Sequence, residues 1–131
     1  MDDLIRYVYF IYGIWFSMNI SAERAGIGAG VLLRALEPLE GINLMRRRRP
    51  GAPDRDLARG PGRLATAMRI NRAHDGLDLC GGGSLWLGSI KRPVGFIGRS
   101  VRIGISREVR RRLRFYERGN PFIGGLKQLS P

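Results

Sequence analysis

The 131 residues are 44% hydrophobic and 26% charged, which is ordinary for one globular domain and excludes wholesale disorder. Lys and Arg number 23 against 11 acidic residues, so the net charge is +12, and all the cations except Lys91 and Lys127 are arginine. Such an excess favours a polyanionic partner, because phosphate neutralisation releases counterions. A compositional bias of the genome would explain the arginine excess equally well.

Cysteine and histidine are too scarce for several kinds of site. Cys80 is the only cysteine, which excludes an internal disulfide and favours a reducing compartment, and no paired base is visible that would make it a nucleophile. His74 is the only histidine, and its surroundings have no metal-ligand spacing. We therefore expect no metal and no cofactor.

The start of the chain is acidic and argues against a secretory signal. The apolar run from Tyr7 to Ile20 is shorter than the about 20 residues that cross a bilayer. We expect a cytoplasmic protein that does not bind membranes.

The first part of the chain predicts strands. Residues 4–21 are rich in aromatic and β-branched residues and break near Tyr12 and Gly13, which predicts an aromatic β-hairpin with Tyr12 at its tip. A glycine-rich loop at 26–30 precedes a predicted buried strand from Val31 to Leu36, which carries one charge, Arg34.

Two prolines predict the starts of helices, because proline is favoured in the first helical turn. Pro38 begins a helix with an apolar stripe of Leu39, Ile42 and Met45, and Pro61 begins another that ends near Met68. The segment 50–60 between them is expected to be a loop. Further short strands are predicted at 77–79, 85–87, 101–105 and 113–116. Together these elements predict an α+β fold: a single β-rich domain over residues 1–131, with mostly antiparallel strands and two or three helices.

Several motifs follow one another in the order of a known family. They are Tyr9-Phe10-Ile11-Tyr12-Gly13, Met18-Asn19-Ile20, Gly30-Val31-Leu32-Leu33-Arg34-Ala35-Leu36-Glu37-Pro38-Leu39-Glu40-Gly41, Gly60-Pro61-Gly62-Arg63-Leu64, Asn71-Arg72, Gly76-Leu77-Asp78-Leu79, Arg102-Ile103-Gly104-Ile105, Arg114-Phe115-Tyr116 and Gly119-Asn120-Pro121. The chain resembles the mammalian-type 3-methyladenine (alkyladenine) DNA glycosylase family over residues 7–123. The resemblance implies a monofunctional, hydrolytic enzyme of base-excision repair that acts on damaged purines in duplex DNA, with no cofactor.

The resemblance assigns roles in base flipping to three residues of the hairpin. Tyr12 would intercalate into the duplex, Tyr9 would stack on the extruded purine, and Asn19 would line the same pocket. Enzymes that act on a base need a wedge to fill the gap in the stack and an aromatic surface to receive the base, so these residue types fit the chemistry. Packing in the core is the alternative for any aromatic strand, and we expect Phe10, Ile14, Phe16 and Met18 to be core.

Further roles follow from the same resemblance. Arg34 and the main-chain carbonyl of Ile103 would hold the attacking water, although a structural salt bridge is an alternative for Arg34. Arg49, Arg63 and Arg72 match positions that contact backbone phosphates. The rest of the run at 46–48, and the second arginine cluster at 107–112, are expected to form solvated faces.

One departure from the family bears on catalysis. Family members carry a general-base glutamate in a Glu-(Thr/Ala)-Glu-Ala-Tyr motif ahead of the hairpin, and none of the 11 acidic residues here matches it. We expect a chain truncated at its N-terminus that binds DNA with little or no turnover, since loss of a general base costs about 10²–10⁴-fold.

Alternatives remain at this stage. The chain could be a non-catalytic basic module that binds damaged duplex DNA, or a protein of the membrane surface that uses residues 5–20 and its arginine clusters. A lyase would need an amine nucleophile, and Lys91 and Lys127 lie in no recognisable pocket motif. A monomer associated with the nucleoid is expected.

Overall fold

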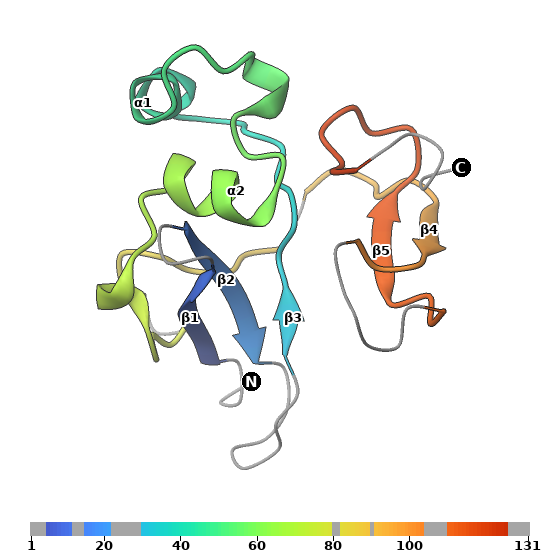
Figure 1. Ribbon diagram of the computed structural model, residues 1–131, viewed down its shortest axis with the longest axis horizontal. Helices are drawn as coiled ribbons and strands as arrows, with labels where there is room; N and C mark the ends of the chain where they lie inside the picture. The colour runs from blue at the N-terminus through green and yellow to red at the C-terminus, as the bar shows by residue number, and fades with distance from the viewer. Residues whose placement is uncertain are drawn as a thin grey trace.

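The computed structural model describes residues 5–11, 15–21, 30–79, 82–89, 91–103 and 110–125, and within the first two strands it describes side chains only at 16–20. Its described part forms two small antiparallel sheets with two short helices, which confirms the predicted α+β class. In Figure 1, α2 lies beside the first sheet, α1 lies farther out, and the second sheet stands on the other side of β3.

The first sheet has the order β1-β2-β3 and contains the predicted hairpin. Strands β1 (Ile5–Ile11) and β2 (Trp15–Ser21) pair antiparallel, from Ile5 opposite Ser21 to Ile11 opposite Trp15. This pairing confirms a chain reversal between residues 11 and 15. Tyr12, the expected tip, lies outside the described residues, as do most of the loop at 26–30, Cys80 and residues 104–109.

The third strand is shorter than predicted. β3 covers only Val31–Leu32, which pair with Ile20 and Asn19, and Val31 is 55% exposed. The expected buried strand from 31 to 36 is therefore wrong. The chain leaves β2 after the hydrogen bond from Leu33 to Met18, and then bridges to a different segment through Ala35 and Arg59.

Helix α1 (Ile42–Arg48) begins four residues after Pro38, so the predicted start is wrong. Gly41 precedes the helix with φ 72°, a left-handed conformation that cannot continue a right-handed helix in either direction. Leu39 is 76% exposed, whereas Met45 packs against the core. The apolar stripe of this helix is consequently shorter than the sequence suggested.

Helix α2 (Pro61–Ala67) confirms the second prediction, with Pro61 in its first turn and Met68 at its C-cap. The segment predicted as a loop before it contains a 3-10 turn, η1 (Asp54–Asp56), and another, η2 (Arg72–His74), follows it.

The second sheet consists of β4 (Ile97–Ser100) and β5 (Arg114–Glu117), with Ser100 opposite Arg114. β5 confirms the strand predicted at 113–116. Of the strand predicted at 101–105, residues 101–103 are not in a strand because the ladder ends at Ser100, and residues 104 and 105 lie outside the described residues. The structure assigns no strand to 77–79 or to 85–87, although the backbone N–H of Leu87 donates to the carbonyl of Leu79.

The hydrophobic core lies between β2 and α2. Its buried members are Met18, Ile20, Ala58, Leu64, Ala65, Ala67, Ile70 and Leu79, with Phe16 and Met45 packed against them. Met18 is core as expected and Phe16 packs at the edge, whereas Phe10 and Ile14 lie outside the described side chains. The two buried alanines of α2, Ala65 and Ala67, let the helix approach the sheet closely. The single domain over 1–131 stays a prediction.

Replacement of Leu64 by alanine should lower the free energy of unfolding by about 2–5 kcal/mol, because the side chain is fully buried and leaves a cavity. Leu39→Ala is the matched control, and it should change stability by less than about 0.5 kcal/mol. Urea denaturation followed by circular dichroism measures both. Equal losses for the two variants would show that the core is not where the structure places it.

Candidate functional site

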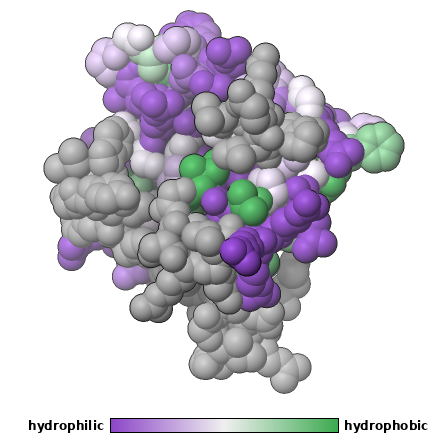
Figure 2. Space-filling view, turned by 45° about the vertical axis from the view of Figure 1, so that its right-hand side comes forward, coloured by the Kyte–Doolittle hydropathy of each residue, from purple (hydrophilic) through white to green (hydrophobic). Residues whose placement is uncertain are grey.

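A cleft of about 890 Å³ lies between the two sheets. One wall is the chain from Gly30 to Glu37 together with Asn19, and the other is formed by β5, by Arg102 and by the loop from Asn120 to Gly124. Figure 2 shows that hydrophilic side chains cover much of the described surface on the face turned forward there, with a few apolar groups between them. A cleft of this size, lined mainly by apolar side chains with a few charged groups among them, can admit a planar base.

Strand β2 has two buried faces of different chemistry. Met18 and Ile20 alternate with Ser17 and Asn19, and all four are buried. The apolar pair belongs to the core, while Asn19 lines the cleft and donates from Nδ2 to Ser17 Oγ at 3.5 Å. Because side chains alternate along a strand, one strand supports the core and presents a polar amide to the cleft.

The hairpin places Tyr9 near this amide along the backbone. Tyr9 pairs with Ser17, two residues from Asn19 on the neighbouring strand. The two positions are thus close in the ladder, although they are ten residues apart in the chain. The stacking role of Tyr9 and the intercalating role of Tyr12 stay predictions.

The structure brings Arg34 and Ile103 together. Arg34 Nη2 donates to the carbonyl oxygen of Ile103 at 2.6 Å, across a sequence separation of 69 residues. The acceptor that Arg34 contacts here is a main-chain carbonyl. The alternative of a structural salt bridge would need a carboxylate at this place. Burial lowers the pKa of Arg34, and the charges of Arg114 and Arg102 lower it further. The site therefore brings together guanidinium groups from both walls of the cleft.

The three predicted phosphate contacts lie on or beside the two helices. Arg63 is exposed in the first turn of α2, and its Nη1 reaches the carbonyl of Arg59 at 3.5 Å. Arg72 is exposed at the start of η2. Arg49, in contrast, donates from Nη1 to the carbonyls of Asp56 and Leu57, and its pKa is lowered by burial and then by the charge of Arg63. Arg49 thus supports the loop that follows it.

The other arginines at the end of α1 are partly engaged within the protein. Arg46 pairs with Asp54 at 2.5 Å, and this hydrogen-bonded pair lowers the pKa of Asp54. Arg48 donates to the carbonyl of Ala67 at 2.8 Å. The expectation that residues 46–48 form a solvated face therefore holds for Arg47, which is exposed. It holds only in part for Arg46 and Arg48, because their bonds tie α1 to η1 and α2.

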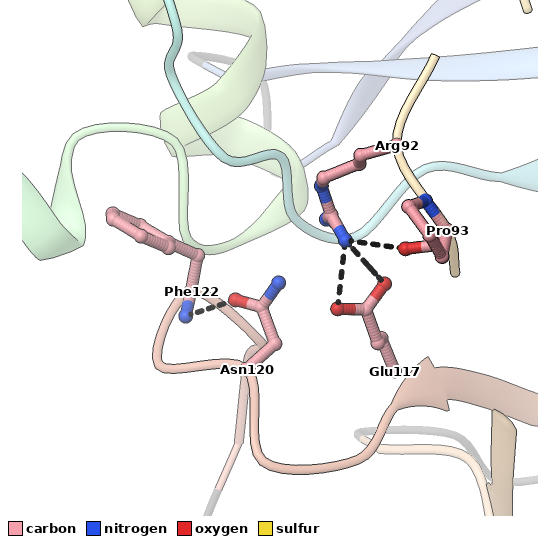
Figure 3. A network of polar contacts seen from close by, with 5 residues as sticks. All are labelled: Arg92, Pro93, Glu117, Asn120 and Phe122. Carbon is pink, nitrogen blue, oxygen red and sulfur yellow. Dashed lines mark hydrogen bonds and ion pairs between the residues drawn. The ribbon is translucent and has the colours of Figure 1, made fainter. Parts of the chain in front are cut away.

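Polar contacts involve several residues of the cleft wall that contains β5 (Figure 3). Arg92 Nη1 donates to the carboxylate of Glu117 at 3.3 Å and to the carbonyl of Pro93. Asn120 Oδ1 accepts from the backbone N–H of Phe122 at 2.8 Å, which holds the turn after β5. Glu117, Asn120 and Phe122 all line the cleft, so this network keeps that wall in place.

Sequence reasoning missed Arg114 as a site residue. It stands between Leu113 and Phe115 in a strand, is 5% exposed and lines the cleft. The signal that could have identified Arg114 is a charged residue in an otherwise apolar predicted strand, which is also the signal that identified Arg34.

The residues that the structure describes contain no cluster of three or more His, Cys, Asp or Glu side chains. No helix within the described ranges is long and apolar enough to span a membrane.

The sequence of the chain matches a known protein family. The model of the methylpurine-DNA glycosylase (MPG) family matches residues 1–121. The chain belongs to this family. It is 56% identical over 124 residues to a candidate 3-methyladenine DNA glycosylase of Mesorhizobium japonicum, covering 95% of this chain and 60% of the relative. A similar relative in Paraburkholderia phytofirmans is 51% identical over 123 residues, covering 94% of this chain and 58% of the relative.

A human relative extends the comparison beyond bacteria. The DNA-3-methyladenine glycosylase of Homo sapiens is 40% identical over 138 residues, covering 95% of this chain and 46% of the human protein. The chain therefore spans about half to three fifths of the length of the relatives that it matches. The family expected from the motifs is confirmed.

Proposed function

We propose that this chain is the DNA-contacting and base-receiving part of a monofunctional glycosylase that releases alkylated or deaminated purines from duplex DNA. The observation that carries the proposal is the contact of Arg34 with the carbonyl of Ile103 at the wall of a cleft that Asn19 also lines. Family membership gives the chemistry, and this contact offers a donor and an acceptor for one water molecule at that wall.

The two groups suit a water nucleophile. A guanidinium has further N–H donors beyond the one bonded to Ile103, and a carbonyl oxygen has a second lone pair. The water oxygen would accept from Arg34 and one of its protons would be donated to Ile103. Held in this way, the water would attack the anomeric carbon while the glycosidic bond breaks and its electrons leave with the purine.

Activation of that water needs a base, and we propose that these 131 residues do not supply it. No acidic residue matches the family's Glu-(Thr/Ala)-Glu-Ala-Tyr motif. Of the two carboxylates that line the cleft, Glu117 is paired with Arg92, and Glu37 belongs to the Leu-Glu-Pro-Leu-Glu motif that follows Arg34. Binding and base capture by these residues are thus proposed to be separable from rapid hydrolysis.

The hairpin would perform the flipping step. Tyr12 would fill the space left in the duplex, Tyr9 would stack on the purine and Asn19 would test its polar edge. The buried position of Asn19 and the pairing of Tyr9 with Ser17 support this arrangement. Undamaged purines would be selected against because a damaged base costs less to unstack, and a cationic alkylated purine leaves more readily.

A non-catalytic module that binds damaged duplex DNA is the second candidate. The net charge of +12, together with the lack of a matching glutamate in the sequence, favours it. The two candidates differ in whether any base is released.

A protein made of these 131 residues should bind a duplex that contains hypoxanthine and release the base about 10²–10⁴-fold more slowly than the human relative does. The measurement is free hypoxanthine by chromatography, with protein in excess over duplex and a control without protein. Slow release above that control supports the glycosylase. Retention on the duplex with no release supports the binding module, and release at the human rate would contradict the proposed lack of a general base.

Tyr9→Ala and Tyr12→Ala should each weaken binding to the hypoxanthine duplex by about 1–3 kcal/mol, which is about 5- to 150-fold in Kd. Binding to undamaged duplex should change much less, because the stacking partner is missing there. Trp86→Ala is the control, since Trp86 is exposed and lies outside the hairpin. An unchanged ratio of the two Kd values in both tyrosine variants would refute the flipping role.

Arg63→Gln and Arg72→Gln should each lower the slope of log Kd against log salt concentration by about 0.9, because each removes one phosphate contact. Arg46→Gln should leave the slope unchanged, since this guanidinium is engaged with Asp54. Fluorescence anisotropy with a labelled duplex between 50 and 200 mM salt, about the range over which such slopes are steep, gives the values. Equal slopes for all three variants would remove Arg63 and Arg72 from the interface.

A further inference from the structure

Arg114 is buried in an unusual place for a cation. It is 5% exposed in β5, on the same face as the buried Tyr116, while Phe115 between them is 59% exposed. Burial lowers the pKa of Arg114, because removing a charged group from water costs free energy. Hydrogen bonds to the guanidinium must offset this desolvation cost. The role of this residue is not explained by the family chemistry proposed above.

The guanidinium of Arg114 joins two segments that are distant in the chain. Nη1 donates to Ser100 Oγ at 2.8 Å, and Nη2 donates to the carbonyl of Gly124 at 2.5 Å. The Cζ atom of Arg114 also lies 4.7 Å from the centre of the Tyr116 ring, and this cation–π contact helps to fix the plane of the guanidinium. A planar fork with divergent donors can make these three contacts at once, whereas a lysine ammonium cannot.

Both of these segments border Ile103. Ser100 ends β4 three residues before it, and Ser100 Oγ also donates to the carbonyl of Val101. Gly125 follows Gly124 with φ +89°, and a β-carbon there would lie 2.5 Å from the Cδ1 of Ile103. The chain after β5 thus packs against the side chain of Ile103, and Arg114 holds that chain and the end of β4 together.

We propose that Arg114 is a positioning residue that fixes the carbonyl of Ile103 where Arg34 and the attacking water can reach it. In this proposal Arg114 acts through its bonds to Ser100 and Gly124, and not through a contact of its own with the water or the base. This inference rests on the proposed function for its catalytic consequence only. Its structural part, the coupling of Arg114 to the contact between Arg34 and Ile103, holds whether or not the chain releases base.

The structural part is tested by thermal unfolding of wild type, Arg34→Met, Arg114→Met and the double variant. Arg34→Met should lower Tm by about 3–5 °C and Arg114→Met by about 10 °C or more. The double variant should lose no more than Arg114→Met alone, because the bond of Arg34 to Ile103 is already lost when Arg114 is absent. Losses that simply add would overturn the proposal.

If charge repulsion were the main interaction between the guanidiniums of Arg34 and Arg114, the Tm loss of the double variant would depart from additivity in the opposite direction. Each single variant would relieve the same repulsion, so the double variant would lose more than the sum of the two, and that result also overturns the proposal. If Arg114→Met does not fold, Ser100→Ala takes its place, since it removes one of the two acceptors and leaves the charge. Its loss should be smaller and should again fail to add to that of Arg34→Met.

The catalytic part is tested by the rate of hypoxanthine release from the fully bound duplex, corrected for the folded fraction. Arg114→Met should lower this rate by about 10²-fold, as a misplaced reacting group does, while Kd for the duplex changes less than about threefold. Arg118→Met, an exposed arginine just after β5, should change neither value. A rate per folded molecule equal to wild type overturns the positioning role. A wild type without release refutes the proposed function instead, and the thermal measurements still decide the coupling.

Discussion

The hydrogen bond from Arg34 to the carbonyl of Ile103 joins the segment after β3 to the segment after β4, and the proposed water site depends on it. A half-buried guanidinium is costly unless its protons are bonded, so the position of this carbonyl decides whether Arg34 can stay in the cleft wall. The charges of Arg114 and Arg102 add to that cost, since they lower the pKa of Arg34 after burial has done so. An anionic ligand of the kind proposed above would offset this repulsion.

The net charge overstates how many cations can face a polyanion. Three of the four arginines at the end of α1 bind within the protein: Arg46 to Asp54, Arg48 to the carbonyl of Ala67, and Arg49 to the carbonyls of Asp56 and Leu57. These bonds hold α1 to the loop and helix beside it. Burial of apolar side chains contributes little to the packing of α1, because no residue of this helix is fully buried. Arginine serves both purposes here because its fork can satisfy carbonyls as readily as phosphates.

Strand β2 couples the core to the site. Met18 and Ile20 pack with α2 on one side, and Ser17 and Asn19 are buried on the other, with Asn19 in the cleft. A close-packed interior transmits small shifts, so a change of volume beneath β2 is expected to displace the amide of Asn19 in the cleft. Mutations in the core are therefore expected to alter the geometry of the cleft as well as stability.

Patterns that act over a few residues were sufficient to predict several elements. The glycine break near residue 13 predicted the hairpin, Pro61 predicted the start of α2, and the short run at 113–116 predicted β5. The family motifs also named Arg34 and Ile103, but their meeting could not be derived from local patterns, because 69 residues separate them. Pro38 misled, since the left-handed backbone at Gly41 decided where α1 begins. Only the tertiary structure decided which arginines are bonded within the protein. These bonds, including those of Arg114 to Ser100 and Gly124, need carbonyls and hydroxyls that packing brings together from distant parts of the chain.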